Sequence, residues 1–152
     1  MAKFSTEQAA SAAAINQLIN DWAYELDVNN GINIAGLVTE QCDYTVRGVA
    51  RTSRGEVEKF YAGRLASFSG TPAGVPTQRH ALSNLRVSFN SADDAAITFT
   101  LVYYTTAGMS SGLGHADPAA VADVRMNVHR GADGDWLISM FDSAQIFVRK
   151  PS

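Results

Sequence analysis

The stretch "RHALSNLRVSFNSADDAAITFTLVYY", residues 79–104, predicts two β-strands joined by a short turn. Residues 78–90 and 94–107 are both rich in Val, Ile, Thr, Tyr and Phe, the residue types that strands favour. The polar run "NSADD" between them is short enough to close a hairpin. We therefore expect a long antiparallel strand pair at this point of the chain.

Two further strands are predicted downstream of this hairpin, over residues 120–131 and 135–148. The sequence "ADGD" between them contains Asp133 and Gly134, which supply the chemistry of a tight turn. The segment 108–119 is too long and flexible to be only a turn, and we expect it to form a lid over a pocket mouth. The second half of the chain is thus predicted as four long antiparallel strands.

A long amphipathic helix is predicted near the start of the chain. Ser5 followed by Gln8 has the form of a capping box, and apolar residues then recur at helical spacing as far as Leu26. The helix should therefore span residues 6–29. The run "NNGIN" ends it, because Asn and Gly tolerate the left-handed conformation of a helix C-terminus.

The sequence between this helix and the hairpin predicts three shorter elements. "IAGLV" indicates one further short turn of helix, and "CDYTVRG" reads as a strand. Ser53 and Glu56 repeat the capping-box signature, and apolar residues follow at helical spacing, which predicts a second helix over residues 54–67. Helices that precede a run of long strands are typical of an α+β domain with a curved sheet wrapped around the long helix.

Length and composition limit the number of domains and the classes of partner. The 152 residues, 46% of them hydrophobic and 18% charged, fit one globular domain with a real core. The net charge is -3 and the 12 Lys and Arg residues are scattered, so we expect no nucleic-acid partner. The apolar run "AASAAAI" is flanked by polar residues such as Glu7 and Asn16, so it predicts neither a signal peptide nor a membrane span, and we expect a cytoplasmic protein.

Neither a metal nor a cofactor is expected. Cys42 is the only cysteine, which excludes an intrachain disulfide and a cysteine-rich metal site and favours a buried thiol. His115 and Asp117 are two potential ligands on one loop, and two ligands do not make a metal site. The nearby run "GMSSGLG" lacks the lysine and the spacing of a phosphate-binding loop.

Five segments taken in order resemble a known family: "AAINQLINDWAYELDVNNGINIAGLVTEQCDYTVRG", "SRGEVEKFYAGRL", "RHALSNLRVSF", "DDAAITFTLVYY" and "ADVRMNVHRGADGDWLIS". Together they are similar to a SnoaL-like domain of the nuclear transport factor 2-like superfamily. The resemblance covers nearly the whole chain and implies a single domain over residues 1–152. It implies a cone-shaped α+β barrel, in which N-terminal helices pack in a strongly curved, mostly antiparallel sheet around an apolar pocket. The superfamily includes dehydratases, ketosteroid isomerases, epoxide hydrolases and polyketide cyclases, and also non-catalytic small subunits of ring-hydroxylating dioxygenases.

The resemblance implies a catalytic pair. In relatives that dehydrate rings, a strand histidine works with an aspartate near the end of the first helix, and these positions are His80 and Asp27 here. A tyrosine five residues before that aspartate also takes part in the relatives, and this chain has Trp22 there. Indole offers one weakly acidic N–H and no phenol. Tyr24 does not replace the missing phenol, because at helical spacing it points about 160° away from Trp22.

The alternation of residues around His80 leaves its direction open. Ala81, Leu85, Val87 and Phe89 form the cleaner apolar face, so strict alternation puts His80 on the opposite, polar face. A β-bulge between residues 80 and 85, or a dimer partner covering the second face, would bring the histidine inside. Asp27 has a similar alternative, since a carboxylate at a helix end often lies in water.

Six more residues are candidates for binding a substrate. Trp22, Tyr44, Phe60, Tyr103 and Phe141 offer aromatic surface that suits a ring-shaped ligand, although such residues are more often plain core. Asn127 is the sixth, because some relatives place an asparagine on the corresponding strand to bind a substrate carbonyl. It alternates with Met126 and Val128, so solvent is the usual explanation for its position.

Two functions follow from these residues and the resemblance. The first is a lyase or isomerase of the dehydratase or cyclase type, acting without a cofactor on a cyclic, largely apolar small molecule. His80 would be the general acid and base, Asp27 would orient it, and Asn127 or Tyr103 would hold an oxygen. The alternative is a non-catalytic ligand-binding or assembly subunit, which Trp22 in place of tyrosine favours. Relatives commonly pair through the sheet, so we expect a homodimer in either case.

Overall fold

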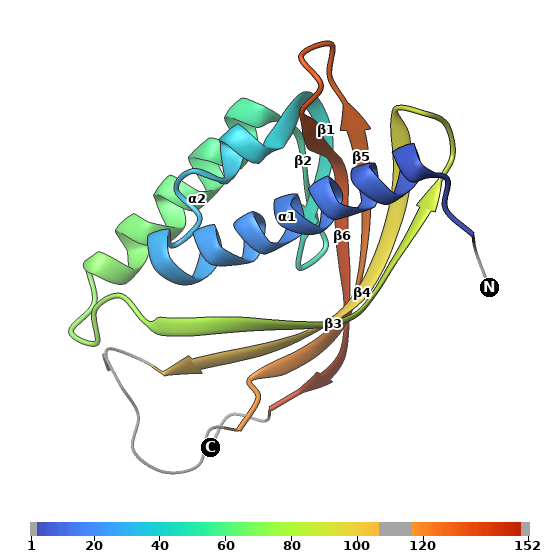
Figure 1. Ribbon diagram of the computed structural model, residues 1–152. Helices are drawn as coiled ribbons and strands as arrows, with labels where there is room; N and C mark the ends of the chain where they lie inside the picture. The colour runs from blue at the N-terminus through green and yellow to red at the C-terminus, as the bar shows by residue number, and fades with distance from the viewer. Residues whose placement is uncertain (1–2, 107–116, 150–152) are drawn as a thin grey trace.

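The computed structural model describes residues 3–106 and 117–149. Its elements follow the predicted order of helices and then long strands (Figure 1). They are α1 Thr6–Asn29, the 3-10 helix η1 Ile34–Leu37, β1 Val38–Val46, β2 Val49–Ser53, α2 Arg54–Ser69, β3 Thr77–Phe89, β4 Asp94–Thr106, β5 Ala120–Arg130 and β6 Trp136–Val148. The predicted lid at 108–119 and the candidate ligand His115 lie largely or wholly outside the described residues.

Both predicted helices are confirmed, together with the caps that start them. The Ser5 hydroxyl accepts the backbone N–H of Gln8, whose side chain accepts the backbone N–H of Ser5, so the capping box is complete. At the other end of α1, Asn30 adopts the left-handed conformation with φ 56°. The Ser53 hydroxyl likewise accepts the backbone N–H of Glu56 at the start of α2, but the Glu56 carboxylate accepts the backbone N–H of Thr52, so the predicted second capping box is only half formed.

The six strands form one curved sheet in the order β2-β1-β6-β5-β4-β3. All neighbouring strands are antiparallel except β1 and β6, which pair in parallel. The sheet curves around α1, and α2 lies across its open side (Figure 1). Because β2 and β3 are the two edges of this order, the sheet is an open cone and does not close into a barrel.

The sequence prediction missed β2. The strand predicted at "CDYTVRG" ends in a two-residue turn, because Arg47 and Gly48 both have positive φ, at 51° and 75°. Such a turn matches the twist of two antiparallel strands, so the chain reverses there and returns along β1 as β2. Because of this reversal, Arg47 lies at the tip of a hairpin and not in the middle of a loop.

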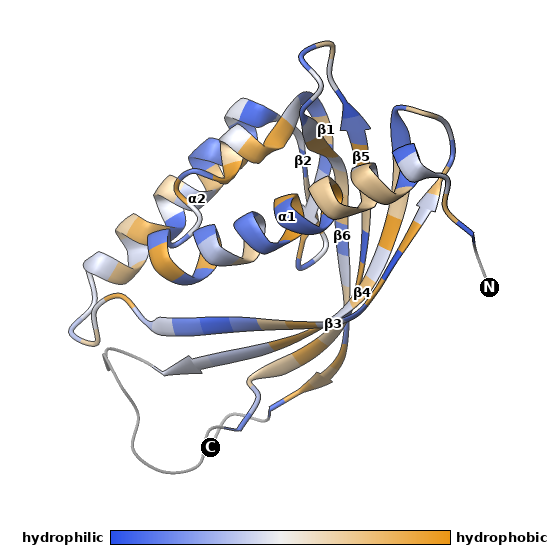
Figure 2. Cartoon of the chain, in the orientation of Figure 1, coloured by the Kyte–Doolittle hydropathy of each residue, from blue (hydrophilic) through white to orange (hydrophobic). Residues whose placement is uncertain are grey.

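The core lies between α1 and the concave face of the sheet. The buried side of α1 consists of Ile15, Leu18, Ile19, Trp22, Ala23 and Leu26. Along β5 the alternation is strict, with Val124, Met126 and Val128 buried and the residues between them exposed. Figure 2 shows the corresponding mixture of hydrophobic and hydrophilic residues along both helices and the strands. Elements of this kind bury one face, and here that face surrounds the inner space of the cone.

A β-bulge in β3 turns His80 toward this inner face. Pairing with β4 is regular as far as Ser83, shifts, and resumes at Arg86, while Asn84 between them has φ 57°. Two residues of β3 therefore stand opposite one residue of β4, which exchanges the inner and outer positions of the strand. Before the bulge Gln78, His80 and Leu82 are the more buried residues, and after it Leu85 and Val87 are.

The bulge that the sequence allowed between residues 80 and 85 is thus present. The assignment of Ala81 to the same face as Leu85 was wrong, because the two residues lie on opposite sides of the bulge and Ala81 is exposed.

Candidate active site

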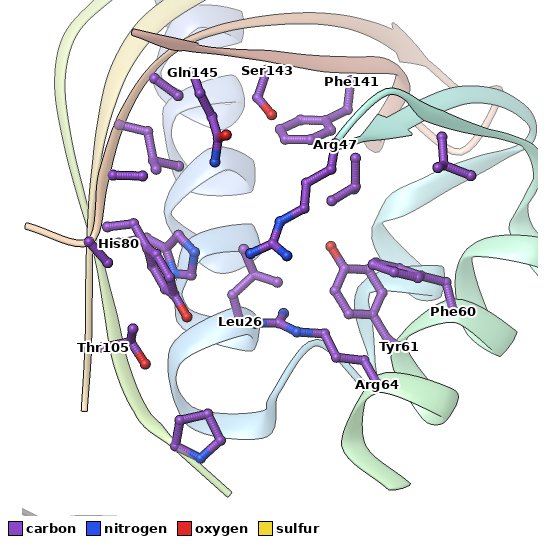
Figure 3. Close-up of a pocket in the computed structure, with 18 of the residues that line it drawn as sticks. Leu26, Arg47, Phe60, Tyr61, Arg64, His80, Thr105, Phe141, Ser143 and Gln145 are labelled. Carbon is purple, nitrogen blue, oxygen red and sulfur yellow. The ribbon is translucent and has the colours of Figure 1, made fainter. Parts of the chain in front are cut away.

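The open side of the cone holds a cavity of about 1090 Å³ between the two helices and the sheet. His80 points into it from β3, Phe141, Ser143 and Gln145 from β6, and Tyr61 from α2 (Figure 3). Apolar walls with a few polar groups are typical of small-molecule sites, and this volume can hold a ligand of several rings.

His80 and Asp27 form a tightly bonded pair at the wall of the cavity. The Nδ1 atom of His80 lies 2.6 Å from Oδ1 of Asp27, and the backbone N–H of His80 donates to Oδ2 at 3.0 Å. Both side chains are largely buried, with exposed fractions of 10% and 12%. The carboxylate therefore holds the ring of His80 and the strand behind it at the same time.

The remaining ring nitrogen of His80, Nε2, faces the cavity. A carboxylate only accepts hydrogen bonds, so in the neutral imidazole the bond to Asp27 puts the proton on Nδ1 and leaves a lone pair on Nε2. His80 lines the cavity, whereas Asp27 lies behind it. The ring is also fixed by Tyr103, whose ring centroid lies 4.8 Å away, and by the edge of Trp22. A neutral histidine held in this way can take a proton from a bound molecule.

Trp22 occupies the position at which the family resemblance places a tyrosine, and its indole N–H is used inside the protein. It donates to the hydroxyl of Tyr44 at 2.9 Å, and that hydroxyl lies 2.7 Å from the hydroxyl of Tyr61. The chain of hydrogen bonds ends at Tyr61, which lines the cavity. When Tyr44 donates to Tyr61, the O–H of Tyr61 is free to donate to a ligand.

Burial keeps both phenols protonated. It raises the pKa of Tyr61 to about 12, and it raises the pKa of Tyr44 well above its ordinary value, with the neighbouring Tyr61 adding to the effect. Neither hydroxyl is therefore a base near neutral pH. Tyr61 is instead a neutral hydrogen-bond donor of the kind that polarises a carbonyl.

Gln78 connects the end of α1 to the cavity. It is the one buried polar residue of the described core, and its amide N–H donates to the backbone carbonyl of Leu26. Its amide oxygen accepts from Arg64 at 3.0 Å and from the Tyr103 hydroxyl at 3.1 Å. A buried amide with these partners fixes the position of two cavity side chains.

The structure brings most of the predicted site residues together. Trp22, Phe60, Tyr103 and Phe141 line the cavity with His80. Tyr44 lies behind this wall, where it is fully buried and stacks on Phe141.

Asn127 does not line the cavity, so the predicted contact between Asn127 and a substrate carbonyl is wrong. The strict alternation of β5 buries Met126 and Val128 and leaves Asn127 exposed on the outer face of the sheet. The structure therefore gives it no role in the site.

Sequence reasoning missed several polar residues of the cavity, among them Tyr61 as a donor, Arg47 and Arg64. One signal for Arg64 was present. It follows Val57 and Tyr61 at helical spacing, so a charged residue lies on the stripe that buries α2. Arg47 gave no such signal, because its place at the tip of a hairpin depends on the β2 strand that was not predicted.

Metal-binding residues do not gather in the described part of the chain. Residues 3–106 and 117–149 contain no group of three or more His, Cys, Asp or Glu side chains that could hold an ion. Cys42 is buried as predicted, and burial raises the pKa of its thiol. No helix within the same residues is long and apolar enough to cross a membrane.

Neither the protein-family models nor the curated proteins searched match this chain. Solved structures do. A putative scytalone dehydratase from Novosphingobium aromaticivorans has a TM-score of 0.77 and 17% identity, over 98% of this chain and 93% of its own. The hexachlorocyclohexane dehydrochlorinase LinA-type3 from Novosphingobium barchaimii has a TM-score of 0.72 and 19% identity, over 94% and 91%.

A third similar structure contains a small molecule. It is a protein from Catenulispora acidiphila in complex with S-DNPA, with a TM-score of 0.73 and 18% identity over 91% of this chain and 95% of its own. Identities this low establish the fold and leave the function open. The two helices and the open curved sheet therefore share the fold of these structural neighbours, an α+β cone of the kind that the sequence resemblance predicts.

Proposed function

We propose that this protein is a lyase or isomerase that acts without a cofactor on a cyclic, largely apolar small molecule. The observation that carries the proposal is the bond between His80 and Asp27, which leaves Nε2 of His80 facing a cavity of about 1090 Å³. A base with a carboxylate behind it and a cavity in front is the minimum apparatus for removing a proton from carbon.

The chemistry assigns one role to each polar group. Nε2 of His80 takes a proton from the carbon next to a ring carbonyl, and Asp27 stabilises the imidazolium that forms. Tyr61 donates a hydrogen bond to the carbonyl oxygen, where negative charge develops. In an elimination, the electron pair of the broken C–H bond forms the C=C bond, the C–O bond to a β-hydroxyl breaks, and the imidazolium returns its proton to the departing oxygen as water. In an isomerisation, the same proton returns to another carbon.

Two observations favour an enzyme over a non-catalytic binding subunit. A subunit needs no polar floor in its cavity, yet His80 and Asp27 are held within hydrogen-bond reach. Two structural neighbours also carry names of elimination enzymes, a dehydratase and a dehydrochlorinase. Loss of water and loss of HCl share the removal of a proton from carbon, the step assigned to His80.

The proposal is tested with a panel of cyclic β-hydroxy ketones that includes 3-hydroxy-1-tetralone. We expect the protein to accelerate loss of water from at least one of them, followed by the near-ultraviolet absorbance of the conjugated product. In D₂O, proton removal also appears in NMR spectra as deuterium uptake next to the carbonyl, even where no water is lost. Compounds that bind without either signal would support the binding subunit instead.

We also propose that the protein is a homodimer that pairs through its sheet. The C-terminal end of β6 exposes Ile146 and Phe147, at 49% and 66%, whereas the next residue, Val148, lines the cavity. Large apolar side chains gathered at one place on a sheet favour a protein partner. Size-exclusion chromatography at micromolar concentration should give about twice the 16.3 kDa of one chain, and Phe147→Glu should give the single chain. A monomeric wild-type protein would contradict the dimer.

A further inference from the structure

The charged side chains around the cavity are all cationic. Within the described residues, the lining contains five side chains with a permanent positive charge and no carboxylate. These are Arg47, Arg51, Lys59, Arg64 and Arg149. The whole chain has the opposite balance, with 12 Lys and Arg against 15 Asp and Glu. An acidic protein that gathers cations around one cavity concentrates a positive potential there.

Two of these cations have local partners that account for them. Arg51 lies over the ring of Phe60 at 3.6 Å and donates to a backbone carbonyl in its own strand. Arg149 donates to the backbone carbonyl of Asp117 at 3.4 Å. The charges of Arg51 and Arg149 contribute to the positive potential, but both side chains are held by these contacts within the protein.

Arg47 and Arg64 differ from these in their direction, because both side chains extend into the cavity. Figure 3 shows the two side chains reaching the middle of the cavity, Arg47 from the β1–β2 turn and Arg64 from α2. Arg64 donates to the amide oxygen of Gln78 and lies over the ring of Phe68 at 5.4 Å, and neither of these partners carries a negative charge. Arg47 has no hydrogen bond or ion pair to any other residue in the described ranges, and its φ of 51° is a conformation that L residues adopt at a cost.

Two positive charges in one cavity repel one another, and an anion bound between the two guanidinium groups would offset this repulsion. The guanidinium group presents a planar fork of donors that matches a carboxylate better than any other side chain does. We propose that Arg47 and Arg64 form an anion subsite that binds the carboxylate of a cyclic carboxylic acid. This deepens the proposed function, on which it rests, by naming the class of substrate.

The subsite also orients the substrate. His80 enters from β3 and the two guanidinium groups come from the opposite side, from α2 and the β1–β2 turn (Figure 3). When Arg47 and Arg64 hold the carboxylate, the ring system of the substrate lies along Tyr61 and Phe141. The end of the ring system farthest from the carboxylate then points toward His80. Substrates are therefore ring acids whose reacting carbon is separated from the carboxylate by the body of the ring.

The test uses two fluorescent probes of the same shape and different charge, anthracene-2-carboxylate and anthracene-2-carboxamide. Fluorescence anisotropy gives their dissociation constants. We expect the wild-type protein to bind the acid at least about tenfold more tightly than the amide, since hydrogen bonds to charged groups are stronger than those to neutral ones. Arg47→Gln and Arg64→Gln should each remove most of this preference, and added salt should weaken it.

Arg86→Gln is the matched control, because Arg86 is exposed on the outer face of β3 and the substitution removes the same charge. It should leave the preference for the acid unchanged. Arg47→Gln carries the test on its own, since Arg47 has no partner in the described structure whose loss could unfold the protein. Equal binding of acid and amide by the wild-type protein, or equal effects of the Arg47 and Arg86 substitutions, would overturn the subsite.

The same probes separate this inference from the proposed function. His80→Ala should keep the preference for the acid, because the subsite lies across the cavity from His80. If the preference for the acid persists but no ring compound is turned over, the anion subsite is supported and the proposed enzymatic function is contradicted. If ring ketones are turned over but acids are not preferred, the proposed enzymatic function is supported and the anion subsite is contradicted.

Discussion

His80→Ala should lower kcat on any substrate of this protein by about 10²- to 10⁴-fold, the usual contribution of a positioned acid or base. The dissociation constant of the same compound should change little, because the walls of the cavity and its two arginines remain. The reason is geometric: Nε2 of His80 faces the cavity with a lone pair, and the bond to Asp27 holds it there. Steady-state kinetics and direct binding measurements separate the two effects.

His129→Ala is the matched control for this experiment. His129 also bonds an aspartate through Nδ1, with 2.8 Å to Oδ1 of Asp94, but its side chain is 49% exposed on the outer face of the sheet. The same substitution in a similar pair should leave kcat unchanged. Imidazole added to the His80→Ala protein should restore part of the rate, since it can enter the space that the side chain leaves. Full turnover by His80→Ala without imidazole would rule the mechanism out.

The helices were predictable because the signals that start and end them are local. Ser5 and Gln8 form one capping box, Ser53 caps the second helix, and Asn30 closes the first in the left-handed conformation. The long strands were predictable for a similar reason, since composition and alternation reach over many residues. β2 has only five residues, Val49–Ser53, and its partner precedes it by a two-residue turn, so neither signal was long enough to reveal it.

The direction of His80 was not predictable from alternation alone. The bulge that turns it inward depends on Asn84 adopting a positive φ, which asparagine tolerates without requiring. The reach of Arg47 and Arg64 was harder still, because long side chains can fold toward solvent or toward a cavity with little change in local energy. Only the packing of α2 and the β1–β2 turn around the open side of the cone brings the two guanidinium groups into the same cavity.

Asp27→Asn should also lower kcat by about 10²- to 10⁴-fold, although it removes no atom that touches the cavity. In the wild-type protein the two carboxylate oxygens accept the backbone N–H and the ring N–H of His80. An asparagine offers one acceptor and one donor in the same place. Its oxygen must satisfy the buried backbone N–H, because an unmet donor there costs about 1–3 kcal/mol. Its NH₂ then faces Nδ1, which must become an acceptor.

The ring proton of His80 consequently moves to Nε2, and the nitrogen that faces the cavity becomes a donor that can no longer take a proton. Two-bond ¹H–¹⁵N NMR spectra of the imidazole should report this change of tautomer, which a merely structural role of Asp27 would not produce. Asp94→Asn, in the exposed pair with His129, should leave kcat unaltered. If Asp27→Asn keeps both the wild-type rate and the wild-type tautomer, Asp27 does not position the base. A lost rate with the wild-type tautomer would instead assign Asp27 to stabilising the charge on the imidazolium, because that charge forms only when His80 accepts the proton.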